Sequence, residues 1–166
     1  MLYDCENDFG RPGKIVGGMF DISTQIQYAL EARKQSYSPY SHFQVGAALA
    51  AVDETIYTGC NIENAAYSPT NCAERTAFFK AVSEGKRQFT SIVIAGGAEN
   101  LGDTLEEFCP PCGVCLQVMM EFCNPEQFKV ILAKSQKECR VYLLKDLFPK
   151  GFSPGALERS TAHADV

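Results

Sequence analysis

The sequence has 166 residues, of which 46% are hydrophobic, and a formal net charge of −5 at pH 7. A chain of this length can bury one hydrophobic core, so we expect one globular domain. The acidic balance argues against binding to a nucleic acid backbone, which requires clustered Lys and Arg. No apolar run reaches the ~18 residues of a membrane span, and the acidic start does not look like a signal peptide, so we expect a cytoplasmic protein without membrane contact.

The N-terminal part of the chain predicts an arm, a helix and a hairpin. Residues 1–20 mix glycines and charges without an apolar period, so we expect a flexible arm. From Asp21 the apolar residues recur at helical spacing, which predicts an amphipathic helix that ends before Ser38-Pro39. Two strand-like segments separated by an Asp-Glu turn then predict an antiparallel hairpin, at 43–52 and 56–62.

The rest of the chain alternates between helices and strands. Apolar residues at helical spacing predict a helix from Cys72 to Glu84, and another at 111–122 that begins with a proline. A short apolar run closed by Gly96-Gly97 predicts a buried strand between them. Two further strands and a short helix are expected at 128–133, 140–144 and 145–147. The alternation predicts an α/β fold, a three-layer α/β/α sandwich with a central five-stranded mixed sheet.

Three cysteines stand where two of these helices begin. Cys112 and Cys115 are three residues apart on one helical turn, so both thiols face the same way and can share one ion. Cys72 starts the other helix, and helix N-termini stabilise thiolates. Three ligands with an open fourth position are typical of catalytic zinc. Glu74, two residues after Cys72, is close enough to accept a proton from a metal-bound water.

A closed structural zinc site is the alternative. Cys109 lies three residues before Cys112, so by count a fourth thiolate is available. Pro110-Pro111 hold the chain extended directly after Cys109 and favour a helix start at the following cysteines. We therefore expect Cys109 to lie outside the metal ligands. A structural site in a binding module would also have no use for Glu74.

Longer segments around the cysteines resemble one known family. They read YSPYSHFxVGAA from Tyr37, GCNIENA from Gly59, CAERTA from Cys72 and PCxxC from Pro111. Together they are similar to the small homotetrameric, zinc-dependent cytidine deaminases of the cytidine and deoxycytidylate deaminase superfamily. The resemblance sets a cytidine deaminase-like catalytic domain at residues 21–157 and leaves a C-terminal tail at 158–166.

The resemblance implies an enzyme of pyrimidine salvage that hydrolyses cytidine and deoxycytidine to uridine and deoxyuridine with release of ammonia. One Zn²⁺ per subunit would be held by Cys72, Cys112 and Cys115, and a zinc-activated hydroxide would attack C4 while Glu74 moves the protons. Three thiolates leave excess negative charge around the ion, which makes ionised Glu74 less favourable. Arg75 matches the family arginine that compensates for this charge.

The same resemblance assigns the contacts to the nucleoside. Phe43 resembles the ring that packs on the base, and Ala73 would offer its backbone N–H to the base carbonyl. Asn61 and Glu63 resemble the pair that holds the ribose 3′-hydroxyl. A carboxylate beside the sugar would repel a phosphate, so a free nucleoside is the expected substrate. The alternative that keeps the zinc chemistry is another aminated base or an aminopyrimidine.

Tetrameric members of the family complete each pocket with a neighbouring subunit. The positions that match those contacts are Ala65, Tyr67 and Phe152, so a homotetramer is expected. Leu116 departs from the family pattern, because many members carry an arginine after the second cysteine of the pair. The expected partners are therefore the nucleoside, water and further copies of the chain, with no nucleic acid and no membrane.

Overall fold

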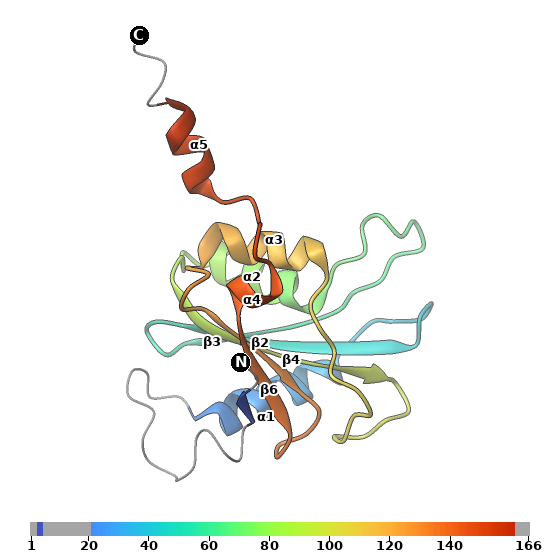
Figure 1. Cartoon of the computed structure of the whole chain (residues 1–166). Coiled ribbons are helices and arrows are strands. Elements are labelled where there is room, and N and C mark those ends of the chain that lie inside the picture. Colours follow the sequence, from blue (N-terminus) through green and yellow to red (C-terminus); the bar gives the residue numbers. More distant parts are fainter. Residues whose placement is uncertain (1–2, 5–20, 162–166) are drawn as a thin grey trace.

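The computed structural model describes residues 3–4 and 21–161, and it shows a mixed β-sheet between two layers of helices (Figure 1). The helices are α1 (Ile22–Arg33), α2 (Ala73–Ser83), α3 (Gly113–Phe122), α4 (Leu144–Leu147) and α5 (Pro154–Thr161). The strands are β1 (Tyr3–Asp4), β2 (Phe43–Ala51), β3 (Ile56–Cys60), β4 (Phe89–Ala98), β5 (Lys129–Ala133) and β6 (Cys139–Leu143). The predicted α/β/α sandwich is confirmed.

The sheet contains the five predicted strands and one short addition. Its order is β1-β6-β5-β4-β2-β3, with β4 and β5 parallel and the other neighbouring pairs antiparallel. The addition is β1, which pairs with Val141 and Arg140 at the edge of β6. It lies within the segment expected to be a flexible arm, and the rest of that arm lies outside the described residues. The sheet is therefore mixed, as the alternation of elements predicted.

Each face of the sheet carries its own apolar core. In β4, Ile92 and Ile94 belong to the core beneath α2 and α3, whereas Val93 and Ala95 belong to the core beneath α1. The two faces alternate because successive side chains of a strand point to opposite sides. Figure 1 shows α1 on one side of the sheet and α2, α3 and α4 on the other. Burial on both faces explains why the central strands read as continuous apolar runs.

The end of β4 differs from the sequence prediction. The expected strand closed at Gly96-Gly97, but β4 continues through both glycines to Ala98. Gly96 pairs with Val45 and Gly97 with Gln44 of β2, so pairing with the start of β2 extends the ladder past the predicted end. A glycine in a strand marks a place where another part of the chain approaches closely.

The close approach of α2 to the sheet positions the start of that helix. A methyl group on Gly59 of β3 would lie 2.3 Å from the carbonyl oxygen of Ala73 and 2.5 Å from the backbone nitrogen of Ala77. No larger residue fits there without displacing the helix. Because Gly59 has no side chain, the first turn of α2 can pack in direct contact with the backbone of β3.

The C-terminal part contains one helix that we did not expect. The predicted short helix at 145–147 corresponds to α4, but the chain then forms α5, which projects away from the body (Figure 1). Pro154 is its first residue, a position that suits proline because the missing N–H would be unpaired there. Residues 162–166 of the predicted tail lie outside the described residues.

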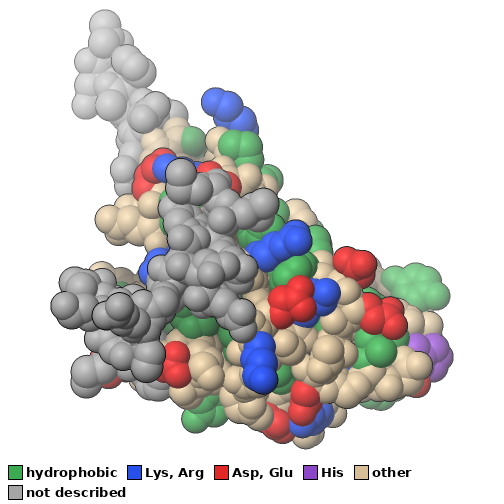
Figure 2. Space-filling model, turned by 60° about the horizontal axis from the view of Figure 1, so that its bottom comes forward, with side chains coloured by type: hydrophobic (Ala, Val, Ile, Leu, Met, Phe, Trp, Pro, Cys, Tyr) green, Lys and Arg blue, Asp and Glu red, His purple; other side chains and the backbone are tan. Residues whose placement is uncertain are grey.

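Two observations concern the surface. On the face that carries α1, the basic and acidic side chains in view are interspersed (Figure 2). This mixture differs from the basic stripe of a nucleic acid-binding surface. Among the helices of the described residues, none combines the length and the apolar character needed to cross a membrane.

Candidate active site

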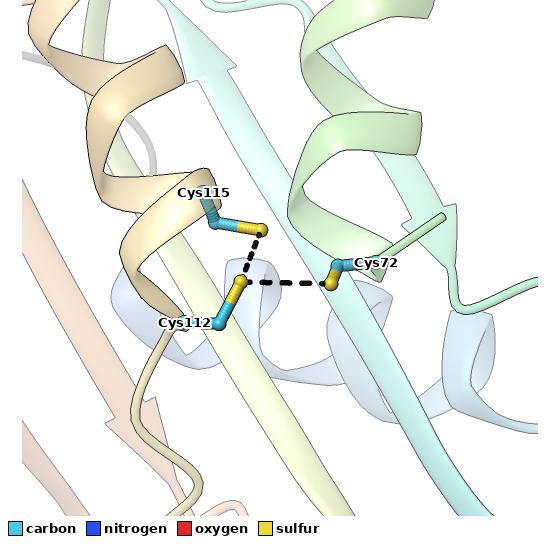
Figure 3. Close-up of side chains that lie close together, drawn as sticks. All are labelled: Cys72, Cys112 and Cys115. Atoms are coloured by element: carbon cyan, nitrogen blue, oxygen red, sulfur yellow. Dashed lines mark hydrogen bonds between the residues drawn. The ribbon is translucent and has the colours of Figure 1, made fainter. Parts of the chain in front are cut away.

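The structure brings three cysteines from two separate segments together (Figure 3). Cys72 is the N-cap of α2, Cys112 is the N-cap of α3, and Cys115 lies one turn further into α3. The Sγ atoms of Cys72 and Cys112 are 3.8 Å apart, and those of Cys112 and Cys115 are 3.6 Å apart. All three sulfur atoms lie within 4.8 Å of one another.

This arrangement fits a zinc ion. Zn²⁺ is bound by thiolates at ~2.3 Å in a tetrahedron, whose edge is then ~3.8 Å, close to the separations of Cys112 from Cys72 and from Cys115. Cys112 is exposed and Cys72 is half-buried, so the group of three is open on one side. Three thiol ligands around an accessible ion form the donor set of a catalytic site.

The helix N-termini favour thiolates at this place. Neither Cys72 nor Cys112 makes a side-chain capping bond, so each sulfur stands before the unpaired N–H groups of a first helical turn. A hydrogen bond from the Cys115 thiol, with others from Arg75 and Cys112, lowers the pKa of Cys72 to about 5. The same bond and burial raise the pKa of Cys115. The surroundings of Cys72 thus favour its thiolate form, which is the form that binds a metal.

Glu74 occupies the first turn of α2 and is only 4% exposed. Burial raises the pKa of its carboxyl to about 7, and the negative charge of Cys72 acts in the same direction. The Cys115 thiol lies within hydrogen-bonding reach of this carboxyl. A buried acid with a pKa near neutrality can both give and take a proton, which is what a general acid and base requires.

Arg75, in the first turn of α2, contacts the thiol of Cys72. Its Nη2 atom donates to the Sγ of Cys72 at 3.5 Å and to the carbonyl oxygen of Thr70 at 3.2 Å. Its Nε atom is buried and has no hydrogen-bond partner among the described residues. The guanidinium group thus places a fixed positive charge beside the thiol with the lowered pKa.

Phe43 and Asn61 form a second group at the start of β2. The Nδ2 atom of Asn61 donates to the carbonyl oxygen of Phe43 at 2.9 Å, and its Oδ1 atom accepts from the backbone N–H of Val45 at 2.8 Å. The amide therefore clamps the backbone on both sides of Gln44. The ring of Phe43 is exposed beside this clamp, where it can stack on a planar ligand.

Glu63 holds the turn that precedes Phe43. Its Oε2 atom accepts from the backbone N–H groups of Tyr40 at 3.0 Å and Ser41 at 3.2 Å. The Ser41 hydroxyl, together with these N–H groups, lowers the pKa of the Glu63 carboxyl. The carboxylate is ionised near neutral pH and keeps oxygen lone pairs for a ligand hydroxyl.

Backbone pairing connects this second group to the thiols. Ile62, which stands between Asn61 and Glu63, exchanges two hydrogen bonds of 2.9 Å with Asn71. Asn71 directly precedes Cys72. The polar residues at the end of β3 are thus connected through the backbone to the start of α2.

The three residues expected to contact a neighbouring subunit are exposed. Ala65 and Tyr67 are exposed on the loop after β3, and Tyr67 packs edge-on against Tyr40 with ring centroids 6.2 Å apart. Phe152 is exposed between α4 and α5, where the amide of Gln117 donates to its carbonyl oxygen at 2.8 Å. The sequence alone did not predict this contact between Gln117 and Phe152. The position of Gln117, two residues after Cys115, would have marked it as a residue near the thiols.

Two further residues of the motif region differ in their surroundings. Leu116 is buried in the core beneath α2 and α3, so an apolar side chain suits that position. Cys109 packs against the same core and does not belong to the group of three thiols. Burial raises its pKa to about 12, and the negative charges of Glu74 and Cys72 add to this effect.

Comparison with known proteins agrees with these observations. The family model of the cytidine and deoxycytidylate deaminase zinc-binding region matches residues 19–132. The cytidine deaminases of Sporosarcina psychrophila and Halalkalibacterium halodurans are 47% and 46% identical over 133 residues, which cover 80% of this chain and 92% and 95% of theirs. A crystal structure of cytidine deaminase from Burkholderia pseudomallei matches with a TM-score of 0.72 and 40% identity, over 80% of this chain and 100% of that one. The chain therefore belongs to the cytidine and deoxycytidylate deaminase family.

Proposed function

We propose that this protein hydrolyses cytidine and deoxycytidine to uridine and deoxyuridine, with release of ammonia, in pyrimidine salvage. The observation that carries the proposal is the convergence of three thiols on two helix N-termini with a buried carboxyl group, Glu74, beside them. The relatives in Sporosarcina psychrophila and Halalkalibacterium halodurans carry the name cytidine deaminase and support this substrate.

Cys72, Cys112 and Cys115 hold the metal in this proposal. Zn²⁺ bound there supplies Lewis-acid chemistry that activates water as a nucleophile. Glu74 takes one proton from the attacking water and delivers it to N3 of the base. It then takes the second proton from the hydroxyl group formed at C4 and delivers it to the amino group, which leaves as ammonia. Its pKa of about 7 suits these transfers, because the carboxyl group changes state easily near neutral pH. Arg75 offsets the charge of the thiolates, so that the metal keeps its pull on water.

The residues around the thiols bind and orient the nucleoside. The exposed ring of Phe43 stacks on the base, and the backbone N–H of Ala73 donates to the base carbonyl. The amide of Asn61 and the carboxylate of Glu63 bind the 3′-hydroxyl while they hold the backbone around Phe43. An ionised carboxylate next to the sugar repels a phosphate, so the nucleotide is excluded.

Four copies of the chain form the working assembly. The aromatic residues Tyr40, Tyr67 and Phe152 are exposed, Tyr67 packs against Tyr40, and α5 projects from the body (Figure 1). Apolar side chains of this size are stable on a surface when another subunit covers them. Ala65, Tyr67 and Phe152 then complete the pocket of a neighbour. Sedimentation velocity should give four times the mass of one chain, and a stable monomer with full activity would contradict the assembly.

The working compartment is the cytoplasm. Cys112 is exposed, and the site requires its sulfur and those of Cys72 and Cys115 as thiolates. A reducing compartment keeps such thiols available to the metal.

Five compounds test the reaction. The purified protein is incubated with cytidine, deoxycytidine, the two corresponding 5′-monophosphates and adenosine, and both ammonia and ultraviolet absorbance are followed. We expect conversion of the two pyrimidine nucleosides and little conversion of the others. Faster conversion of adenosine than of cytidine, or no ammonia from either pyrimidine nucleoside, would overturn the proposal.

A further inference from the structure

Cys109 meets the ring of Phe43 across one glycine of the sheet. A methyl group on Gly96 would lie 2.7 Å from the Sγ atom of Cys109 and 3.2 Å from the Cε1 atom of Phe43. Both groups therefore occupy the space that a side chain at this position of β4 would fill. The thiol and the ring are brought side by side because residue 96 has no side chain.

The thiol of Cys109 also lies near the reacting end of the site. It packs against the core beneath α2 and α3, as Cys72 does, and the negative charges of Glu74 and Cys72 both act on it. It remains a neutral thiol, because burial raises its pKa to about 12. A neutral thiol is a poor nucleophile and a weak metal ligand, so this side chain acts as a small apolar group.

The proposed contacts leave one edge of the base without a partner. Phe43 covers a face of the ring, Ala73 binds the carbonyl and Glu74 serves N3, while C4 faces the metal. The edge next to C4 on the side away from N3 is C5. Cys109 lies beside Phe43, feels the charge of Glu74, and is not used by the proposed chemistry.

We propose that Cys109 forms the wall of the pocket against C5 of the base and sets the size of the 5-substituent that the enzyme accepts. This inference rests on the proposed cytidine deaminase function. The side chain of Cys is smaller than those of Val, Leu or Ile. It therefore leaves a small space beside C5 that those side chains would fill. Removing its sulfur enlarges that space, and a bulkier residue closes it.

Two substitutions of opposite size test the wall. The ratio of kcat/KM for 5-methylcytidine to kcat/KM for cytidine is measured in Cys109→Ala and Cys109→Leu. One methyl group in an apolar pocket changes discrimination by about 10- to 200-fold. We expect the ratio to rise about tenfold in Cys109→Ala and to fall about tenfold in Cys109→Leu, with one zinc per chain in both.

Cys123 provides the matched control. It is also a buried cysteine, but it lies at the other end of α3 in the core beneath α2 and α3. Cys123→Ala should leave the ratio unchanged, so a shift in that variant as well would indicate a general loosening of the fold and would contradict a local wall.

The outcomes separate the inference from the function on which it rests. If the unaltered protein deaminates cytidine but the ratio stays within twofold in both Cys109 variants, the wall is wrong and the function stands. Loss of zinc in Cys109→Ala would make Cys109 a ligand and would also overturn the wall. If the unaltered protein releases no ammonia from cytidine, the proposed function fails and the inference fails with it.

Discussion

Glu74 shows how a single residue acquires its chemistry from its surroundings. An ordinary glutamate at the first turn of a helix is a solvated group that complements the helix dipole. Here the side chain is withdrawn from water beside Cys72, and its pKa rises to about 7. The residue can therefore exchange protons with a substrate near neutral pH, although its position in the sequence is that of a common helix-start carboxylate.

Replacement of this carboxyl tests the proton transfers directly. Glu74→Gln has nearly the same volume but cannot carry a proton, so we expect kcat for cytidine to fall about 100- to 10,000-fold with zinc still bound. Metal content and circular dichroism check that the site and the fold persist. The exposed Glu121 of α3 offers a matched control, and Glu121→Gln should retain activity. Wild-type turnover in Glu74→Gln would contradict the assigned role.

Arg75 makes a second prediction at the level of one residue. Its guanidinium group donates to the Sγ of Cys72, so Arg75→Gln removes the positive charge next to the thiolates. Mutation of a residue that hydrogen-bonds a metal ligand lowers metal affinity or activity by about 10- to 100-fold. We expect a loss of this size in kcat, with one zinc ion still bound per chain. Arg75→Lys should restore part of the activity, because it keeps the charge. Equal losses in both variants would indicate that geometry matters more than charge.

Arg33 connects secondary structure elements around the site. It ends α1, is 3% exposed, and donates to five backbone carbonyl groups. The acceptors belong to the start of β2, the end of β4 and the loop that follows, and they are Gln44, Gly97, Ala98, Leu101 and Gly102. One side chain therefore fastens α1 to the strand ends that carry Phe43 and Gly96.

A conservative change at Arg33 should weaken this connection. Arg33→Lys keeps the charge but loses the planar fork, so several of these carbonyl groups, one buried and the others partly buried, lose their donor. Unpaired buried polar groups cost about 1–3 kcal/mol each, and we expect the free energy of unfolding in urea to fall by about 2–4 kcal/mol. Arg87→Lys is the control, because Arg87 is exposed and a surface change costs about 0.5 kcal/mol or less. Equal midpoints for the two variants would contradict this role.

The order of the elements was largely predictable because each element carries a local pattern. Helical spacing located α1, α2 and α3, and apolar runs located β2 to β6. The pattern failed where a neighbour decided the outcome. β4 continues through Gly96 and Gly97 because β2 pairs with it there. α5 has only eight residues, too few to show a recognisable helical spacing of apolar residues.

At the scale of the whole molecule, a bound metal would connect two helices that are distant in sequence. An ion held by Cys72, Cys112 and Cys115 fastens the start of α2 to the start of α3. A ligand present at ~1,000 times its Kd stabilises the folded state by ~4 kcal/mol. We expect removal of zinc by 1,10-phenanthroline to lower Tm by about 10 °C and abolish activity. Added Zn²⁺ should restore both, and an unchanged Tm after complete removal would contradict a role of the ion in stability.

The spacing of Cys112 and Cys115 was enough to predict that these two thiols share an ion, since residues within one helical turn have a defined mutual geometry. The prediction that Cys72 and Glu74 join them used their place at another helix start and the family resemblance. The same local rules located most strands and helices. Proximity of Cys72 to Cys112, burial of Glu74 and contact of Cys109 with Phe43 were decided only when the sheet was assembled. Each of these three features requires residues distant in sequence to pack against one another. That packing excludes water from Glu74 and so raises its pKa.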